Sequence, residues 1–233
     1  MPYFYGFDTT YLFLVLPCVI LSLWASSNVN STFRRYDKQL SSRHITGAMA
    51  AERVLRANGV YGVGIEQVSG NLTDHYDPRT NTIRLSESVY NAPTIAAVGV
   101  AAHEAGHAVQ YAVGYGPIRL RSAIIPATQF GSKFSFILLL IGLVLYSQPL
   151  FLVGIALFSL TTVFQLVTLP VEFNASNRAL EALGASGYLK EEQLDGAGKV
   201  LRAAAMTYVA ATAVALAQLI RLIAIFGNRR RRD

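Results

Sequence analysis

The sequence predicts a mainly α-helical membrane protein in which a small aqueous domain with a short β element is interleaved with three to four transmembrane helices. Of its 233 residues, 52% are hydrophobic and only 15% are charged, which is unusual for a soluble protein. Several apolar runs are long enough to cross a bilayer, whereas residues 42–121 mix polar and apolar side chains with turn formers. The order of these stretches places membrane helices on both sides of the aqueous domain.

The first apolar run covers residues 11–25 and extends back through aromatic residues at 3–7. It has neither a basic start nor a clear small-residue cleavage site, so we expect a retained membrane anchor and not a signal peptide. Basic residues follow it and predict contacts with anionic lipid headgroups, so the net charge of +6 gives no reason to expect nucleic acid as a partner. These basic residues are Arg34, Arg35, Lys38 and Arg43.

The aqueous domain is expected to begin with a helix and a pair of strands. Thr46 is a good N-cap for a helix over 48–55, which Asn58-Gly59 would end. Short strands are predicted at 64–68 and 82–85, separated by turn formers. An exposed strand edge beside a helix can pair with an extended peptide, and a strand that only packs against its neighbours is an equal alternative. The candidate edge consists of Thr82, Ile83, Arg84, Leu85 and Ser86.

The motif His103-Glu104-Ala105-Gly106-His107 lies among helix formers at 92–109, before glycines at 114 and 116 that would end the helix. On a helix, His103 and His107 lie one turn apart on the same face, so both can bind one metal ion. Glu104 then points to the side where a bound water would lie. This spacing is typical of zinc hydrolases with the glutamate as general base. The alternative is a pair of histidines that are satisfied by hydrogen bonds inside a helical bundle.

Two further apolar runs, 134–146 and 150–168, flank a polar break and predict a transmembrane helical hairpin. Pro170 is expected to interrupt the pattern, so that 171–183 forms a separate helix ended by Gly184. A charged stretch precedes the last apolar segment, 203–226, which either spans the membrane or lies along its interface. The predicted organisation is an anchor at 1–27, a catalytic region at 28–127, a transmembrane hairpin at 128–169, a third-ligand helix with a connector at 170–202, an apolar helix at 203–228 and a basic tail at 229–233.

A catalytic zinc site has three protein ligands and one open position, so the two histidines need a partner. Glu172 is favoured because a lone carboxylate directly after an apolar run is costly near a membrane boundary, and an antiparallel hairpin returns the chain to the side it left. These three ligands predict a zincin-like catalytic domain of the gluzincin type with one Zn²⁺ per chain, although the ligand types also suit iron or manganese. The other candidates for the third ligand are His44, His75, Asp74 and Asp77.

Four segments carry a resemblance to a known family: DHYDP at 74–78, IRLS at 83–86, VAAHEAGHAVQ at 100–110 and LPVEFNAS at 169–176. They are similar to the bacterial neutral zinc metallopeptidases of the YugP-like membrane family, and the similarity covers nearly the whole chain. The order of a metal helix, two membrane helices and then Glu-Phe-x-Ala is more distantly similar to the HtpX-type heat-shock proteases and the CAAX prenyl proteases. In those proteins the Glu of the second motif is the third zinc ligand, which implies Glu172 here.

One difference from the HtpX-type proteins is visible four residues after the ligand, where they have Asp and this chain has Ser176. The residues that could replace this Asp in orienting a ligand are Asn174, Ser176, Asn177 and Arg178.

The implied function is that of a membrane-bound zinc metalloendopeptidase, in which Glu104 takes a proton from the attacking water and passes it to the leaving amine. A donor side chain would help the metal to stabilise the oxyanion, and His75, Arg178 and Tyr208 are candidates. The expected partners are a peptide or membrane-protein substrate and the lipid bilayer. The HtpX resemblance implies a role in membrane-protein quality control, and no feature of the sequence indicates an oligomeric state.

Two other functions fit parts of the pattern. A non-catalytic membrane scaffold or chaperone-like partner could keep zinc for structure, although such a site has no use for a base at Glu104. A site-2-type intramembrane protease, in which a Leu-Asp-Gly segment supplies an Asp ligand, fits the apolar stretch 92–113. The strand and turn residues upstream favour an aqueous face over this second alternative.

The charge distribution predicts the orientation in a plasma membrane that the chain crosses several times. A start without lysine or arginine and a basic cluster after the first span place the N-terminus outside and the catalytic domain in the cytoplasm. The hairpin keeps Glu172 on the cytoplasmic side. If 203–226 also spans, the arginines at 229–232 lie outside, against the positive-inside tendency, so the side of the C-terminus stays open.

Overall fold

The computed structural model is mainly helical, and four of its helices are long and apolar enough to cross a membrane. These four candidate spans are Tyr11–Tyr36, Gly116–Val144, Gln148–Ala185 and Glu191–Gly227. The structure describes residues 9–230, so the aromatic residues expected to extend the first span and the last part of the basic tail, 231–233, lie outside the described residues. Three to four spans were expected, and residues 9–230 contain four helices that qualify by their length and composition.

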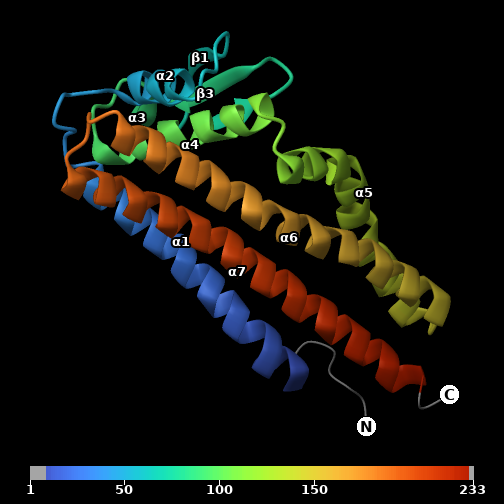
Figure 1. Cartoon of the computed structure of the whole chain (residues 1–233). Coiled ribbons are helices and arrows are strands. Elements are labelled where there is room, and N and C mark those ends of the chain that lie inside the picture. The colour runs from blue at the N-terminus through green and yellow to red at the C-terminus, as the bar shows by residue number, and fades with distance from the viewer. Residues whose placement is uncertain (1–8, 231–233) are drawn as a thin grey trace. The chain divides into compact units, whose positions relative to one another are not determined.

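The elements follow one another with short connections (Figure 1). A π-helical turn, η1 (Tyr11–Val15), continues directly into the first long helix, α1 (Leu16–Tyr36). The later elements are α2 (Gly47–Ala57), β1 (Gly64–Val68), β2 (His75–Asp77), β3 (Thr82–Ser86), α3 (Glu87–Tyr90), α4 (Ile95–Ala112), α5 (Gly116–Val144), α6 (Gln148–Ala185) and α7 (Glu191–Arg230).

The chain divides into two compact units. The first unit contains the chain up to Ala25, Leu120–Leu169 and the chain from Thr207 onward, and the second contains Ser26–Arg119 and Pro170–Met206. Within the first unit, α5 packs closely against α6 because glycine leaves room for the neighbouring backbone. A Cβ atom on Gly142 would lie 2.6 Å from the backbone nitrogen of Phe151.

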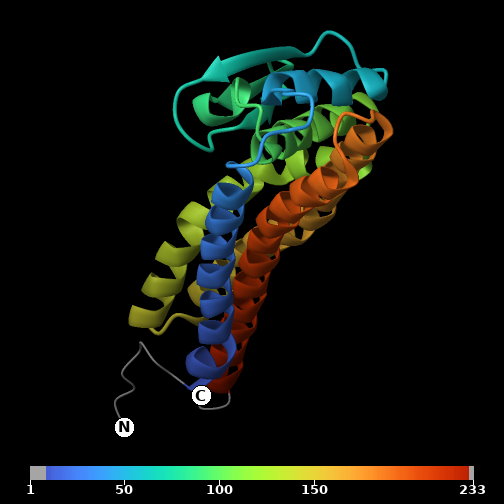
Figure 2. The same ribbon diagram turned by 90° about the vertical axis from the view of Figure 1, so that its left-hand side faces the viewer.

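The second unit contains a three-stranded sheet in the order β1-β3-β2. β3 pairs in parallel with β1 and antiparallel with β2, and its residues Ile83 and Leu85 are fully buried in the core. Figures 1 and 2 show this sheet, α2 and α4 packed together. Strands at 64–68 and 82–85 were expected, but β2 was interpreted as part of a turn because its three residues are too few to show an alternating pattern.

The position of β3 corrects the prediction of a substrate edge at Thr82–Ser86. Thr82, Ile83 and Arg84 have partners on both neighbouring strands, and the backbone N–H of Ser86 donates to Asp74 Oδ1 at 2.8 Å. The prediction of a free edge is therefore wrong, because the backbone groups on both sides of β3 are already used. The edges of the sheet are β1 and β2.

Local signals placed α2 correctly, but two expected helix breaks, at Pro170 and in the charged stretch at 190–199, are wrong. Thr46 caps α2 by accepting a hydrogen bond from the N–H of Met49 at 3.3 Å. Pro170 lies inside α6, where it removes one backbone donor while the buried residues Val171 and Ala175 hold the next turns in the core.

The charged stretch at 190–199, expected to be a connector, is the first part of α7. Glu191 and Glu192 lie in its first turn, where negative side chains stabilise the positive end of the helix dipole. The helix then continues through residue 203 without a break, so the predicted boundary between 202 and 203 does not coincide with the end of an element.

Candidate metal centre

α4 carries the histidine motif and begins where its sequence provides a cap. Thr94 accepts a hydrogen bond from the N–H of Ala97 at 3.2 Å, directly after Pro93. Most of α4 is buried in the second unit, and small residues dominate its buried face. His103 and His107 lie one turn apart and are half-buried, with their ring centroids 4.6 Å apart.

Gly106, between the two histidines, allows α6 to approach α4 closely. A Cβ atom at this position would lie 2.4 Å from the carbonyl oxygen of Ala175, closer than real Cβ atoms come to any neighbour. The same approach brings Glu172, which is 2% exposed, to the two imidazoles. Figure 1 shows α4 beside the C-terminal part of α6.

The three side chains form a compact group of ligand atoms. Glu172 Oε2 lies 3.2 Å from His103 Nε2 and 3.6 Å from His107 Nε2, and the ligand atoms of all three residues lie within 4.8 Å of one another. Tetrahedral zinc with bonds of about 2.0–2.1 Å separates its ligand atoms by roughly 3.3 Å. The two imidazoles and the carboxylate therefore fit a zinc ion, and no other group of three or more such residues occurs among residues 9–230.

Each histidine has a second hydrogen-bond partner through its Nδ1 atom. His103 Nδ1 lies 3.0 Å from Ser176 Oγ, and His107 Nδ1 lies 3.1 Å from Gln110 Oε1. The sequence predicted Ser176 as a residue that orients a ligand, but it missed Gln110. The feature of the sequence that could have identified Gln110 is its place as a polar residue three positions after His107, on the same helix face and in an otherwise apolar stretch.

Two other predicted orienting residues lie on α6 and bind each other. Arg178 Nε donates to Asn174 Oδ1 at 2.8 Å, and Asn174 Oδ1 also accepts from Gln110 Nε2 at 3.0 Å. Asn177 is exposed. Arg178 is thus joined to the histidine helix through two amide side chains, while its predicted role as an oxyanion donor stays a prediction.

Glu104 lies beside the ligands and faces the edge strand β2. Its Oε2 atom accepts a hydrogen bond of 3.1 Å from the backbone N–H of Tyr76, and the Tyr76 ring lies 5.5 Å from that of Tyr111 on α4. The carboxylate is half-buried and is not part of the three-ligand group. A carboxylate outside the ligand group but next to it is placed to exchange a proton with a group bound there.

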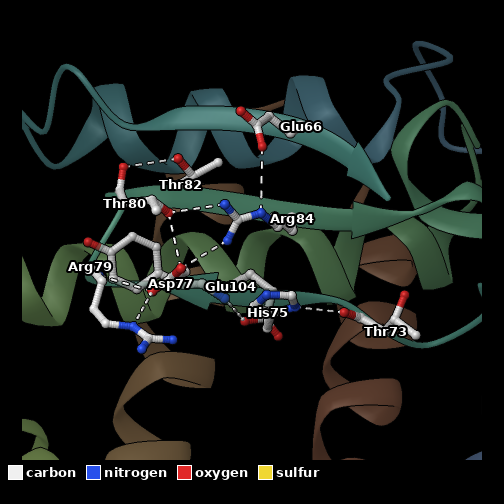
Figure 3. Close-up of polar contacts among 10 residues, drawn as sticks. Glu66, Thr73, His75, Asp77, Arg79, Thr80, Thr82, Arg84 and Glu104 are labelled. Atoms are coloured by element: carbon white, nitrogen blue, oxygen red, sulfur yellow. Dashed lines mark hydrogen bonds and ion pairs between the residues drawn. The ribbon is translucent and has the colours of Figure 1, made fainter. Parts of the chain in front are cut away.

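Asp74 and Asp77, the other carboxylates considered as ligands, are used elsewhere. Burial raises the pKa of Asp74 above its ordinary value, and the negative charge of Glu104 also raises it. The hydrogen bonds from Ser86 act in the opposite direction but do not cancel this rise. Asp77 accepts from Arg84 at 3.0 Å and from the backbone N–H of Arg79. Figure 3 shows Arg84 between Glu66 on β1 and Asp77 on β2, across all three strands.

The remaining predicted residues are not brought into the ligand group. His75 is exposed, its Nδ1 lies 2.8 Å from the Thr73 carbonyl oxygen, and it alternates along β2 with Tyr76, which packs on the α4 side. His44 is also exposed. Tyr208 belongs to the first unit, so its role as a donor stays a prediction.

The chain contains one Leu-Asp-Gly segment, at 194–196, of the kind that supplies the Asp ligand in site-2-type proteases. Asp195 is half-exposed and lies 2.6 Å from Lys199 and 3.2 Å from Arg202. The carboxylate is a surface ion-pair partner and is not part of the ligand group.

Comparison with known proteins agrees with this geometry. Residues 11–227 match the model of a family described as "Putative neutral zinc metallopeptidase". The chain is 46% identical over 220 residues to a Bacillus subtilis (strain 168) protein named "Putative membrane protease YugP", covering 94% of this chain and 98% of that protein. No solved structure matches the chain.

Proposed function

The chain belongs to the family of neutral zinc metallopeptidases, and we propose that it is a membrane-bound zinc metalloendopeptidase with a gluzincin-type catalytic domain. The observation that carries the proposal is the convergence of His103, His107 and Glu172 from α4 and α6, with Glu104 next to them. A structural zinc site would have no use for this fourth, acidic side chain. Zinc bound there would lower the pKa of a water molecule and polarise the carbonyl of the peptide bond.

Glu104 acts as the general base in this proposal. Its carboxylate takes a proton as the water oxygen bonds to the carbonyl carbon, and it then gives that proton to the nitrogen as the C–N bond breaks. The products are a carboxylic acid and an amine, so one water molecule is consumed for each bond cleaved. The hydrogen bond from the Tyr76 N–H holds the carboxylate beside the ligands before substrate binds.

β2 takes the place of β3 as the substrate edge. The backbone N–H of Tyr76 points away from β3, toward Glu104 on α4. The Tyr76 N–H is the donor that an extended peptide pairing with this edge would need, so such a peptide would replace Glu104 as its partner and pass next to the base. Main-chain pairing of this kind recognises any extended segment, which suits an endopeptidase that acts on unfolded loops of membrane proteins. His75 and Arg178, which belong to the same unit as the ligands, remain candidates for the oxyanion donor.

The four candidate spans and the membrane protease relative support a membrane location. We place the catalytic domain in the cytoplasm of a plasma-membrane protein because the basic residues after the first span favour that side. Membrane-protein quality control is the role that fits an endopeptidase held at the membrane surface.

The experiment compares peptide hydrolysis by zinc-loaded wild type and Glu104→Gln, with a library of quenched fluorescent peptides. Loss of the base should lower the rate by about 10²–10⁴-fold. Glu66→Gln is the matched control, because Glu66 is a half-exposed carboxylate on β1 and should leave the rate unchanged. Undiminished hydrolysis by Glu104→Gln would exclude Glu104 as the base. A folded, zinc-loaded wild type that cleaves no peptide would support the scaffold function.

A further inference from the structure

Gln110 is a fully buried amide on α4, one turn after His107. A buried amide is costly unless its polar atoms are bonded, and both polar atoms of Gln110 have partners. Oε1 lies 3.1 Å from His107 Nδ1, while Nε2 donates to the Val171 carbonyl oxygen at 2.7 Å and to Asn174 Oδ1 at 3.0 Å. The side chain therefore connects one predicted ligand of α4 to the turn of α6 that carries Glu172.

The partners of Gln110 determine which way its amide faces. The Val171 carbonyl oxygen can only accept a hydrogen bond, so the NH₂ group must point toward it. Arg178 can only donate, and its Nε lies 2.8 Å from Asn174 Oδ1, so the oxygen of Asn174 faces both Arg178 and Gln110. Every hydrogen bond in the series Arg178–Asn174–Gln110–His107 then has one possible donor and one possible acceptor.

This direction assigns the proton on the imidazole of His107. Because Gln110 presents its oxygen, Nδ1 of His107 must carry the hydrogen, which leaves the lone pair on Nε2. Nε2 is the atom that faces Glu172, at 3.6 Å. His103 has no such assignment, because the Ser176 hydroxyl can either donate or accept.

We propose that Gln110 is a positioning residue that holds His107 in the tautomer and ring orientation that bind the metal, with Asn174 and Arg178 fixing the direction of its amide. The inference rests on the proposed zinc function. A neutral amide also suits this position because Glu172 in the ligand group and Glu104 beside it would already supply two negative charges for the proposed divalent ion. A third buried carboxylate would be uncompensated.

The test measures zinc dissociation constants by chelator competition, together with the thermal stability of the metal-free protein. Gln110→Met keeps the length of the side chain and removes its hydrogen bonds, so the dissociation constant should rise about 10- to 100-fold. Gln193→Met is the matched control. Gln193 also joins two segments of the second unit, donating to the Leu40 carbonyl and accepting from Ser42, but it is not bonded to a ligand. This control should lower stability without changing zinc affinity.

Variants of Asn174 test the direction of these hydrogen bonds without altering Gln110. Asn174→Asp still accepts from both Gln110 and Arg178 and should weaken zinc binding less than Asn174→Leu. Asn174→Leu leaves the Gln110 amide with one fewer acceptor and should bind zinc more weakly. Equal zinc affinity in wild type, Gln110→Met and Asn174→Leu would overturn the inference. It would also be overturned if every variant, including Gln193→Met, lost zinc affinity in proportion to its loss of thermal stability.

A second readout separates this inference from the proposed function. In the metal-free protein at alkaline pH, ¹⁵N NMR of His107 should show a protonated Nδ1 in wild type and a mixture of tautomers in Gln110→Met. A wild type that binds no zinc would overturn the proposed function, while this spectrum would still report the action of Gln110. A wild-type His107 protonated on Nε2 would overturn the inference even if zinc binds.

Discussion

The two carboxylates of the centre, Glu172 and Glu104, lie in different surroundings and should respond differently to the same change. Glu172 is 2% exposed and contacts both imidazoles, whereas Glu104 is half-buried and bonds to a strand amide. We predict that Glu172→Gln loses most of its zinc because a neutral amide is a poor ligand, while Glu104→Gln keeps about one zinc per chain. Elemental analysis of the purified variants checks this, and full zinc content in folded Glu172→Gln would move the third ligand to another residue.

Asp77 makes the stability of the sheet depend on pH at the acidic end. The backbone N–H of Arg79 and the Arg84 guanidinium lower the pKa of Asp77 from 3.8 to about 2. A depressed pKa means that the ionised form stabilises the folded state above pH 3.8 and that this contribution disappears as the pH falls through about 2. Asp77→Asn should therefore unfold at a lower temperature than wild type at pH 7, and the two melting curves should converge toward pH 2. A constant difference across this range would contradict the prediction.

At the scale of elements, the distance between α4 and α6 depends on Gly106. Gly106→Ala would place a Cβ atom 2.4 Å from the Ala175 carbonyl oxygen, so the two helices must separate. We expect a loss of about 1–3 kcal/mol in the free energy of unfolding and weaker zinc binding, because Glu172 moves with α6.

Gly99→Ala on the same helix is the control for this prediction. Its Cβ would lie 3.5 Å from the Cβ of Ala197, an ordinary van der Waals contact, so stability should hold or rise by up to about 1 kcal/mol. Thermal unfolding and chelator competition on both variants test the difference. Equal behaviour would show that the approach of the helices at Gly106 is unimportant.

At the scale of the whole molecule, the predicted orientation can be tested with single cysteines. Cys18 is the only cysteine, so Cys18→Ser provides a background without thiols. In that background we place a cysteine at Arg79, which is strongly exposed on the second unit, or at Leu145, which is 65% exposed between α5 and α6. An impermeant maleimide should label Leu145→Cys on intact cells and Arg79→Cys only after permeabilisation. The reverse pattern would place the second unit outside.

Interactions within a few residues were predictable from the sequence. Thr46 was predicted to cap α2 and does so, and Thr94, which was not singled out, caps α4 in the same way, each through a hydrogen bond from the residue three positions on. The spacing of His103 and His107 placed both on one face for the same reason, since helix geometry repeats every 3.6 residues. The hydropathy of the long helices likewise depends on local composition.

The sequence by itself therefore determined the metal-binding motif, its helix and the apolar helices, whereas the tertiary structure decided what surrounds the motif. Glu172 lies 69 positions after His103, and their contact depends on the packing of α6 against Gly106. Only packing shows that Gln110 bonds to His107 and Val171, that β2 and not β3 is an edge, and that Pro170 leaves α6 unbroken. The physical reason is range: local propensity acts within a turn of chain, but buried polar partners and strand order are set by which distant segments share a core.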